Sequence, residues 1–125
     1  MKNYFSRLFG DEPVCTILDG NHQCRAGHVY LLGGGGLIKI GYTNEGQNNI
    51  RRRIDDVAQK AHIEFEFLFA LECSCAHGFE QWLHRKYRTS RRRFELFAIT
   101  DADVIEISKI SSFNDAPVHR FDSLE

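Results

Sequence analysis

The 125-residue sequence lacks a long hydrophobic run, and this absence limits the classes of protein to which it can belong. It contains no stretch of about 18 consecutive apolar residues, so we expect no transmembrane helix and no membrane partner. The first residues, MKNYFSRLFGDEP, have neither a sustained apolar segment nor a small-residue cleavage site, so they do not resemble a signal peptide. A cytoplasmic location is therefore expected.

Cysteine is scarce, and its spacing does not favour a metal site. The four cysteines are Cys15, Cys24, Cys73 and Cys75. They form a C-x8-C pair and a C-x-C pair, whereas structural zinc usually needs C-x2-4-C. Without a secretion signal, disulfides are not expected either. Buried or partly buried thiols are the interpretation that remains.

An excess of charge is also missing, because 16 Lys and Arg residues face 17 Asp and Glu residues. The positive charge is nevertheless concentrated in two clusters, Arg51–Arg53 and Arg85–Arg93, which hold nine of the 16 basic residues. One interpretation is a basic face that binds nucleic acid on a near-neutral protein. The other is a solvated helix surface, and charge alone does not separate the two.

The hydrophobic pattern predicts a small α+β domain. Two β-rich runs at residues 28–32 and 37–43 flank a glycine tract, as in a β-hairpin. A helix is expected from about Asn49, with Ile50, Ile54 and Val57 on its apolar face. Strict alternation from Ile63 to Leu71 predicts a half-buried strand with one apolar face.

A second helix is expected at about residues 76–88 and a short strand in the segment 91–99. Thr100 and Asp103 resemble a capping box that opens a third helix through about Ser111. The order predicts an α+β fold with a three-stranded, mainly antiparallel sheet flanked by helices. We divide the chain into an N-terminal arm or cap (1–26), one domain (27–112) and a C-terminal tail (113–125).

The glycine tract in HVYLLGGGGLIKIGYT (28–43) raises the question of a phosphate-binding loop. A P-loop needs G-x-x-x-x-G-K-[ST] before a helix, and a dinucleotide loop needs G-x-G-x-x-G between strand and helix. The tract satisfies neither pattern, and the residues that follow it have strand character. A hairpin turn is the better interpretation, because glycine takes positive φ without steric cost.

Several chemically active side chains flank this hairpin. Tyr30 and Lys39 fall on neighbouring strands, and an arginine cluster follows on the next helix. Glu80 and His84 are four residues apart and share a helix face, although such a pair is also common as a plain surface contact. Phosphodiester hydrolysis uses a set of this kind: a carboxylate for a divalent metal, a cation for phosphate charge, and a group for proton transfer.

The ordered motifs resemble the GIY-YIG nuclease superfamily, in the phage and fungal branch whose second motif reads KIG. HVY (28–30) resembles the first motif and IKIGYT (38–43) the second, with Gly41 as its glycine. RRRIDDV resembles the arginine helix, FEQWLHRKY (79–87) the glutamate helix, and RRFELF the closing segment with Glu95 as its acid. The resemblance covers about residues 27–100.

The resemblance implies a divalent-metal-dependent DNA endonuclease with one Mg²⁺ or Mn²⁺ ion. Tyr30 would be the base or a phenol that positions water, and Glu80 would bind the metal. Arg53, which best matches the motif spacing, or Arg52 as the next match, would contact the scissile phosphate. Lys39 would bind phosphate or lower the pKa of Tyr30, and His84 would assist Glu80. The basic residues expected to contact the DNA backbone are Arg51, Arg52, Arg85, Lys86, Arg91 and Arg92.

Two alternatives stay open at this point. Lys39 stands where the family has a second tyrosine, so the chain could be a catalytically weak DNA-binding or regulatory module on the same fold. A homodimer or a partner protein could supply sequence specificity in a chain this short. If the gene is carried by a phage, the expected location is the cytoplasm of the host cell.

Overall fold

The structure is a computed structural model that describes residues 25–44 and 47–124. The described helices are α2 (Gln47–Ala61), α3 (Ala76–Lys86) and α4 (Asp101–Ser108), with a 3-10 turn at Arg88–Ser90. The strands are β1 (Gly27–Gly34), β2 (Leu37–Thr43), β3 (Glu66–Cys73), β4 (Arg91–Arg93), β5 (Leu96–Phe97), β6 (Ser112–Phe113), β7 (Ala116–Pro117) and β8 (His119–Phe121). None of these helices is long and apolar enough to cross a membrane. Of the predicted arm or cap at 1–26, residues 1–24 lie outside the described part.

Six strands form one sheet in the order β4-β5-β2-β1-β3-β8, and β6 pairs only with β7. Every pairing in the sheet is antiparallel. The predicted α+β class and the antiparallel sheet with flanking helices are confirmed, but the expected size of three strands is wrong. The short strand expected in the segment 91–99 is divided into β4 and β5, and β8 was not expected. These strands are two or three residues long, too short for an alternating pattern to define them in the sequence.

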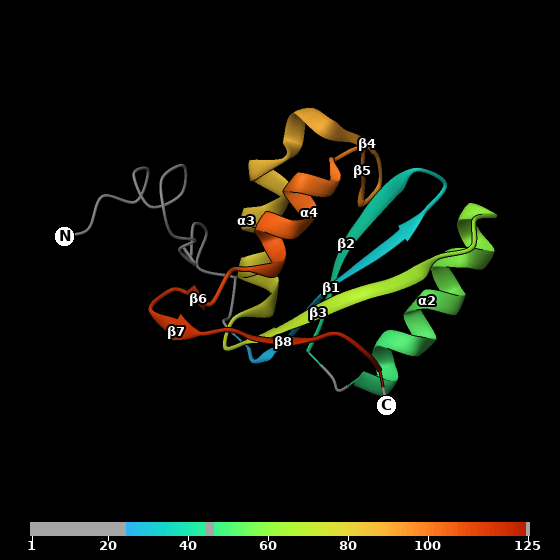
Figure 1. The fold of residues 1–125 in the computed structure, drawn as a ribbon. Helices are drawn as coiled ribbons and strands as arrows, with labels where there is room; N and C mark the ends of the chain where they lie inside the picture. The colour runs from blue at the N-terminus through green and yellow to red at the C-terminus, as the bar shows by residue number, and fades with distance from the viewer. Residues whose placement is uncertain (1–24, 45–46, 125) are drawn as a thin grey trace.

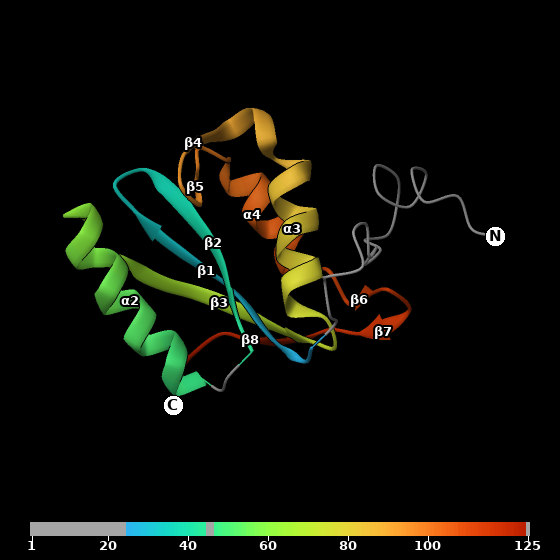
Figure 2. The same cartoon turned by 180° about the vertical axis from the view of Figure 1, so that it is seen from behind.

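Helices cover both faces of the sheet (Figure 1). The helix α2 lies against one face, while α3 and α4 lie against the other, and the reverse view shows the same separation (Figure 2). Successive residues of β1 therefore point into different cores. The core beside α3 and α4 includes Val29, Leu31, Phe69, Phe79, Leu83, Phe97 and Ile107. The core beside α2 includes Tyr30, Leu32, Ile50 and Ala70.

The strand β3 does not keep one apolar face, which corrects the half-buried strand expected from its alternation. The register with β1 shifts between Leu31 and Leu32, so Leu31 pairs with Phe69 but Leu32 pairs with Phe67. A bulge of this kind inserts one residue and changes which side chains face each way. As a result Phe67 packs beside α2, whereas Phe69 packs beside α3.

Several local predictions are confirmed. The helix α4 begins with a capping box in which the Thr100 hydroxyl accepts from the Asp103 amide and the Asp103 carboxylate accepts from the Thr100 amide. It ends at Ser108, shorter than expected. Cys73 and Cys75 are buried in the core, as predicted for thiols, while Cys15 and Cys24 lie outside the described residues. The segment after residue 112 contributes β8 to the main sheet.

The glycine tract forms a hairpin turn, as predicted. The strand β1 continues through Gly34, which pairs with Leu37, so the turn itself is Gly35 and Gly36. Both have positive φ, 59° and 78°. Positive φ at both central residues is the requirement of the type I′ turn that best fits the twist of a two-residue hairpin.

We expect Gly34→Ala to destabilise the fold more than Gly36→Ala. A Cβ at Gly34 would collide with the carbonyl oxygen of Glu64 and lie 2.9 Å from Cδ1 of Phe65, whereas a Cβ at Gly36 meets nothing within 4 Å. Overpacking at Gly34 should lower the free energy of unfolding by about 3 kcal/mol. The unfavourable φ at Gly36 should lower it by about 1 kcal/mol. Urea denaturation of the two variants tests this order, and a larger loss for Gly36→Ala would contradict it.

Candidate active site

The tyrosine of the first motif lies flat over the glycine of the second. Tyr30 pairs with Gly41 across the β1–β2 hairpin, and its side chain is 1% exposed. A Cβ on Gly41 would lie only 2.6 Å from both Cζ and Oη of Tyr30. The missing side chain at Gly41 therefore makes the space in which the phenol lies, as expected for a glycine that permits close approach.

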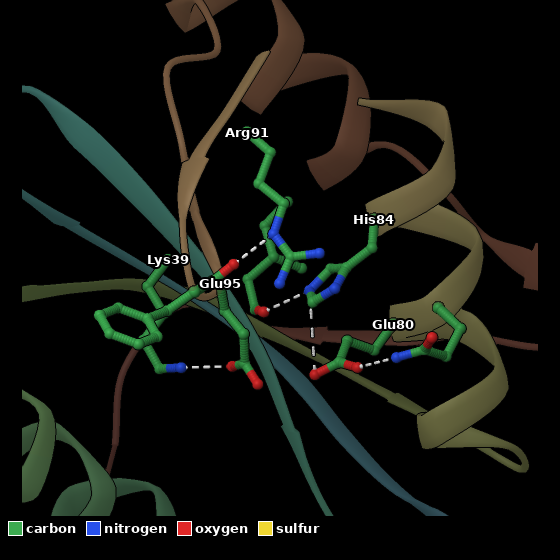
Figure 3. A network of polar contacts seen from close by, with 8 residues as sticks. Lys39, Glu80, His84, Arg91 and Glu95 are labelled. Atoms are coloured by element: carbon green, nitrogen blue, oxygen red, sulfur yellow. Dashed lines mark hydrogen bonds and ion pairs between the residues drawn. The ribbon is translucent and has the colours of Figure 1, made fainter. Parts of the chain in front are cut away.

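Lys39, which is buried, forms an ion pair beside this tyrosine with Glu95, which is partly exposed. Lys39 Nζ donates to Oε2 of Glu95, and the lysine side chain is 10% exposed against 39% for the glutamate. The same ammonium group lies 5.9 Å from the centroid of the Tyr30 ring. Lys39 therefore contacts both the Tyr30 ring and the Glu95 carboxylate, and Figure 3 shows its ion pair with Glu95.

Of the three consecutive arginines on α2, Arg53 is the one that reaches the tyrosine. Its guanidinium group donates a hydrogen bond to the Tyr30 hydroxyl. Burial raises the pKa of Tyr30 well above its usual value, and the positive charge of Arg53 only partly opposes this increase. Tyr30 is therefore a neutral phenol at physiological pH.

The main chain of Ile40 connects three elements at the edge of β2. Its amide donates to the carbonyl oxygen of Glu95 at 3.1 Å. Its carbonyl oxygen lies 2.8 Å from Nε2 of His84 on α3. A carbonyl can only accept, so His84 carries its proton on Nε2. Burial lowers the pKa of His84, although the bond to Ile40 acts in the opposite direction, and the ring is neutral at physiological pH.

Glu80 is a buried carboxylate on α3 whose hydrogen bonds are incomplete. Glu80 is 2% exposed, and its Oε1 accepts a hydrogen bond from Nε2 of Gln81 at 2.8 Å. Oε2 is buried without a hydrogen-bond partner and lies 3.9 Å from Nε2 of His84. Burial, with the negative charge of Glu95, raises the pKa of Glu80 to about 7.

Glu80 therefore fits the role of a metal ligand. Its unsatisfied oxygen faces the same region as the Glu95 carboxylate, and a cation there would relieve both the missing partner and the repulsion between the two groups (Figure 3). In residues 25–44 and 47–124, no group of three or more His, Cys, Asp or Glu side chains is arranged around a metal position. One or two carboxylates suit Mg²⁺, which keeps several waters and binds substrate phosphates.

The structure thus brings together the five residues predicted to be catalytic: Tyr30, Lys39, Arg53, Glu80 and His84. Their charges affect one another, since Arg53 and Lys39 oppose the rise in the pKa of Glu80. The position of His84 favours a supporting role, because its Nε2 proton is committed to the main chain of β2.

The six residues predicted to contact DNA are dispersed. Arg91 lies beside the site, where its Nε donates to the carbonyl oxygen of Phe94. Arg51 donates to the carbonyl oxygen of Leu124 at 2.7 Å, and Lys86 pairs with Glu106 on α4 at 3.0 Å. Arg51 and Lys86 therefore make their polar contacts within the fold, away from the candidate site. Arg52 is exposed on α2 and Arg92 is exposed on β4. Arg85 is partly buried on α3.

A groove of about 660 Å³ beside the site contains residues that the sequence did not single out. They are Lys60 at the end of α2, and Arg93 and Phe94 at the β4–β5 turn. Lys60 carried no motif signal. Arg93 belongs to the second basic cluster, but Phe94 carries no turn signal, since phenylalanine is not a residue that favours turns.

Comparisons with known proteins add one finding. A family model described as the T5orf172 domain matches residues 27–112. No curated protein and no solved structure gives a significant match.

The buried carboxyl of Glu80 should make stability depend on pH. Because its folded-state pKa is raised from 4.5 to about 7, the folded protein binds more protons than the unfolded chain between these values. The free energy of unfolding should therefore fall as pH rises through this range, by on the order of 3 kcal/mol for this group. Above about pH 7 this contribution should be constant.

The matched variant for this test is Glu80→Gln, which keeps the size of the side chain and removes the titration. Denaturant unfolding of metal-free wild type and variant across this pH range gives the difference between them. The variant should gain stability over wild type as pH rises. Parallel stability curves would show that Glu80 ionises without the expected penalty.

We also expect Gly41 and Tyr30 to be strongly coupled. Gly41→Ala places a methyl group against the phenol and should lower the free energy of unfolding by about 1–3 kcal/mol. In a Tyr30→Ala background the same change should have little effect, because the colliding ring is gone. A double-mutant cycle by urea denaturation measures the coupling, and additive losses would contradict the contact.

Proposed function

The chain belongs to the T5orf172 domain family, a phage-associated family of the GIY-YIG and nuclease-like group, and from this premise we propose that it is a divalent-metal-dependent DNA endonuclease. The finer assignment is to the branch with a KIG second motif. The observation that carries the proposal is the buried Glu80 carboxylate, with one oxygen unsatisfied, in a cluster with Tyr30, Lys39 and Arg53.

Two cations are placed to bind the phosphate that is cleaved. Arg53 is exposed on α2 and, beyond its bond to Tyr30, presents further guanidinium donors that suit the bidentate geometry of phosphate. Lys39 contributes a second positive charge from β2. Charge develops on the phosphate oxygens in the transition state, so donors fixed beforehand stabilise it more than they stabilise the ground state.

In this proposal Tyr30 orients the phosphate or the attacking water and does not act as a base. Its raised pKa keeps the proton on Oη, so the hydroxyl can donate to a phosphate oxygen or hold the attacking water. The ring is fixed between Gly41 on one strand and the ammonium group of Lys39. A fixed ring holds Oη in one place, which favours the geometry that the reaction needs.

Glu80 is the residue that would hold the metal, through Oε2. A divalent ion bound there supplies positive charge next to the phosphate and lowers the pKa of water bound to it. His84 supports Glu80 from the same helix face: its Nε2 stays on the carbonyl of Ile40, 3.9 Å from Oε2 of Glu80. In this arrangement His84 positions β2 relative to α3.

Plasmid cleavage tests the proposal. Supercoiled plasmid incubated with the wild-type chain and Mg²⁺ or Mn²⁺ should be nicked or linearised, and Glu80→Ala should slow this by about 100-fold or more. Glu106→Ala is the matched control, because Glu106 is an exposed glutamate on α4 that pairs with Lys86 and with none of the five residues predicted to be catalytic. Full activity of Glu80→Ala, with its fold verified by circular dichroism, would overturn the assigned site.

One observation favours the alternative of a DNA-binding module with weak or absent catalysis. The ammonium group of Lys39 is already neutralised by Glu95, which reduces the charge that it can offer to phosphate. Such a module would bind DNA with strong salt dependence and without turnover. A gel shift run beside the cleavage assay separates the two functions.

A further inference from the structure

Phe94 is a hydrophobic side chain displayed at the tip of a hairpin. In the described part of the chain only Phe94 and Ile105 are large, hydrophobic and exposed, at 75% and 53%. Arg93 pairs with Leu96, so Phe94 and Glu95 are the two residues of the β4–β5 turn. The ring projects from the fold at the turn that also carries the carboxylate of the candidate site.

The backbone at Phe94 adopts a conformation that is unfavourable for a bulky residue. Its φ is 52°, in the left-handed region that a bulky side chain rarely adopts. Glycine, asparagine or aspartate is the usual residue at such a position of a two-residue turn. Arg91 holds the conformation by donating to the carbonyl oxygen of Phe94. Neither folding nor packing accounts for an exposed phenylalanine at a position that suits glycine.

The groove beside the ring is strongly basic. Its charged lining residues are Lys39, Lys60, Arg91, Arg93 and Glu95. Four positive charges therefore face one negative charge, and Lys39 already neutralises Glu95. The guanidinium of Arg93 lies 5.8 Å from the centroid of the Phe94 ring. An aromatic ring with an adjacent arginine in a basic groove suits a polyanion that also presents flat apolar faces.

The groove is continuous with the candidate site, because Lys39 and Glu95 belong to both. A linear polyanion bound along the groove would run from the β4–β5 turn to the site around Glu80. Figure 3 shows Lys39 and Glu95 farther from α3 than His84 and Glu80, with Arg91 reaching toward His84.

We propose that this groove binds an unpaired nucleic-acid strand, with the Phe94 ring stacked on a nucleobase and the basic side chains on its phosphates. The inference rests on the proposed function for one point, that the strand continues to the scissile phosphate. It narrows the substrate class to DNA that is single-stranded or locally opened, such as a flap, a bubble or a frayed end.

Stacking is the reason to choose an unpaired strand over a duplex. A base in a duplex already has both faces covered by its neighbours, whereas a base in a single strand can leave the stack. Base stacking on an aromatic side chain tolerates every base, so this contact selects strand state and not sequence.

The test compares the full-length wild type with Phe94→Gly. Glycine accepts the positive φ at this turn, so the variant should fold at least as stably as the wild type. Fluorescence anisotropy in EDTA, where no cleavage occurs, measures affinity for an oligothymidylate of about 12 nucleotides and for a fully paired duplex of equal length. Loss of the stacked ring should weaken single-strand binding roughly 5- to 100-fold and leave duplex binding unchanged.

Two control variants separate stacking from a general loss of apolar surface. Phe94→Trp should retain single-strand affinity, because tryptophan also stacks on bases. Ile105→Ala removes the other exposed hydrophobic side chain, on α4, and should change neither affinity. An oligouridylate of the same length forms a further arm: a Phe94 effect on DNA identifies a DNA strand, and an effect confined to RNA identifies RNA as the strand bound.

Equal single-strand affinity of Phe94→Gly and wild type would overturn the inference. An equal loss for duplex and single strand would also overturn it, as would a change in oligomeric state by sedimentation, since the ring would then be a protein contact. Failure of the nuclease proposal gives a different result, namely Phe94-dependent strand binding in EDTA without cleavage when Mg²⁺ is present.

Discussion

The main-chain groups of Ile40 are the junction on which the candidate site depends. The amide binds Glu95 and the carbonyl binds His84, so one residue of β2 is joined to the β4–β5 turn and to α3. Ile40 itself is fully buried. Its neighbours Lys39 and Gly41 point to the opposite face, where Tyr30 lies. A single residue of β2 therefore links the turn that carries Glu95 to the helix that carries Glu80.

Near this junction the fold contains electrostatically unfavourable carboxylates. Glu80 is buried with one unsatisfied oxygen, and Glu95 adds a second negative charge nearby. Buried carboxylates without full hydrogen bonding destabilise a fold, and perturbed pKa values gather where such groups have a functional use. The nearby cations, Lys39 and Arg53, offset only part of that cost. The cluster is suited to a cationic ligand and a phosphate together.

The sequence allowed the central elements and much of the site to be predicted. Hydrophobic periodicity located the β1–β2 hairpin and the helices, and the motif order brought Tyr30, Lys39 and Glu80 together. The spacing to Ile54 and Val57 favoured Arg53 among the arginines of α2, but three consecutive arginines match the motif equally well in residue type, so the register stayed open by one or two residues. The bulge in β3 was also invisible, since its apolar side chains alternate regularly in the sequence and the inserted residue is defined only by pairing with β1. The turn at Phe94 was missed because its residue type contradicts its backbone conformation.

The strand β8 has a consequence for the boundary of the folding unit. It pairs with β3 through residues 119–121, beyond the last residue of the family match, and Leu124 accepts a hydrogen bond from Arg51 on α2. Without β8, the main-chain donors and acceptors along that side of β3 would be open to another chain. The segment that follows the shared domain thus covers part of the β3 edge with a strand of three residues, so this chain's sheet is completed by residues that the family match does not include.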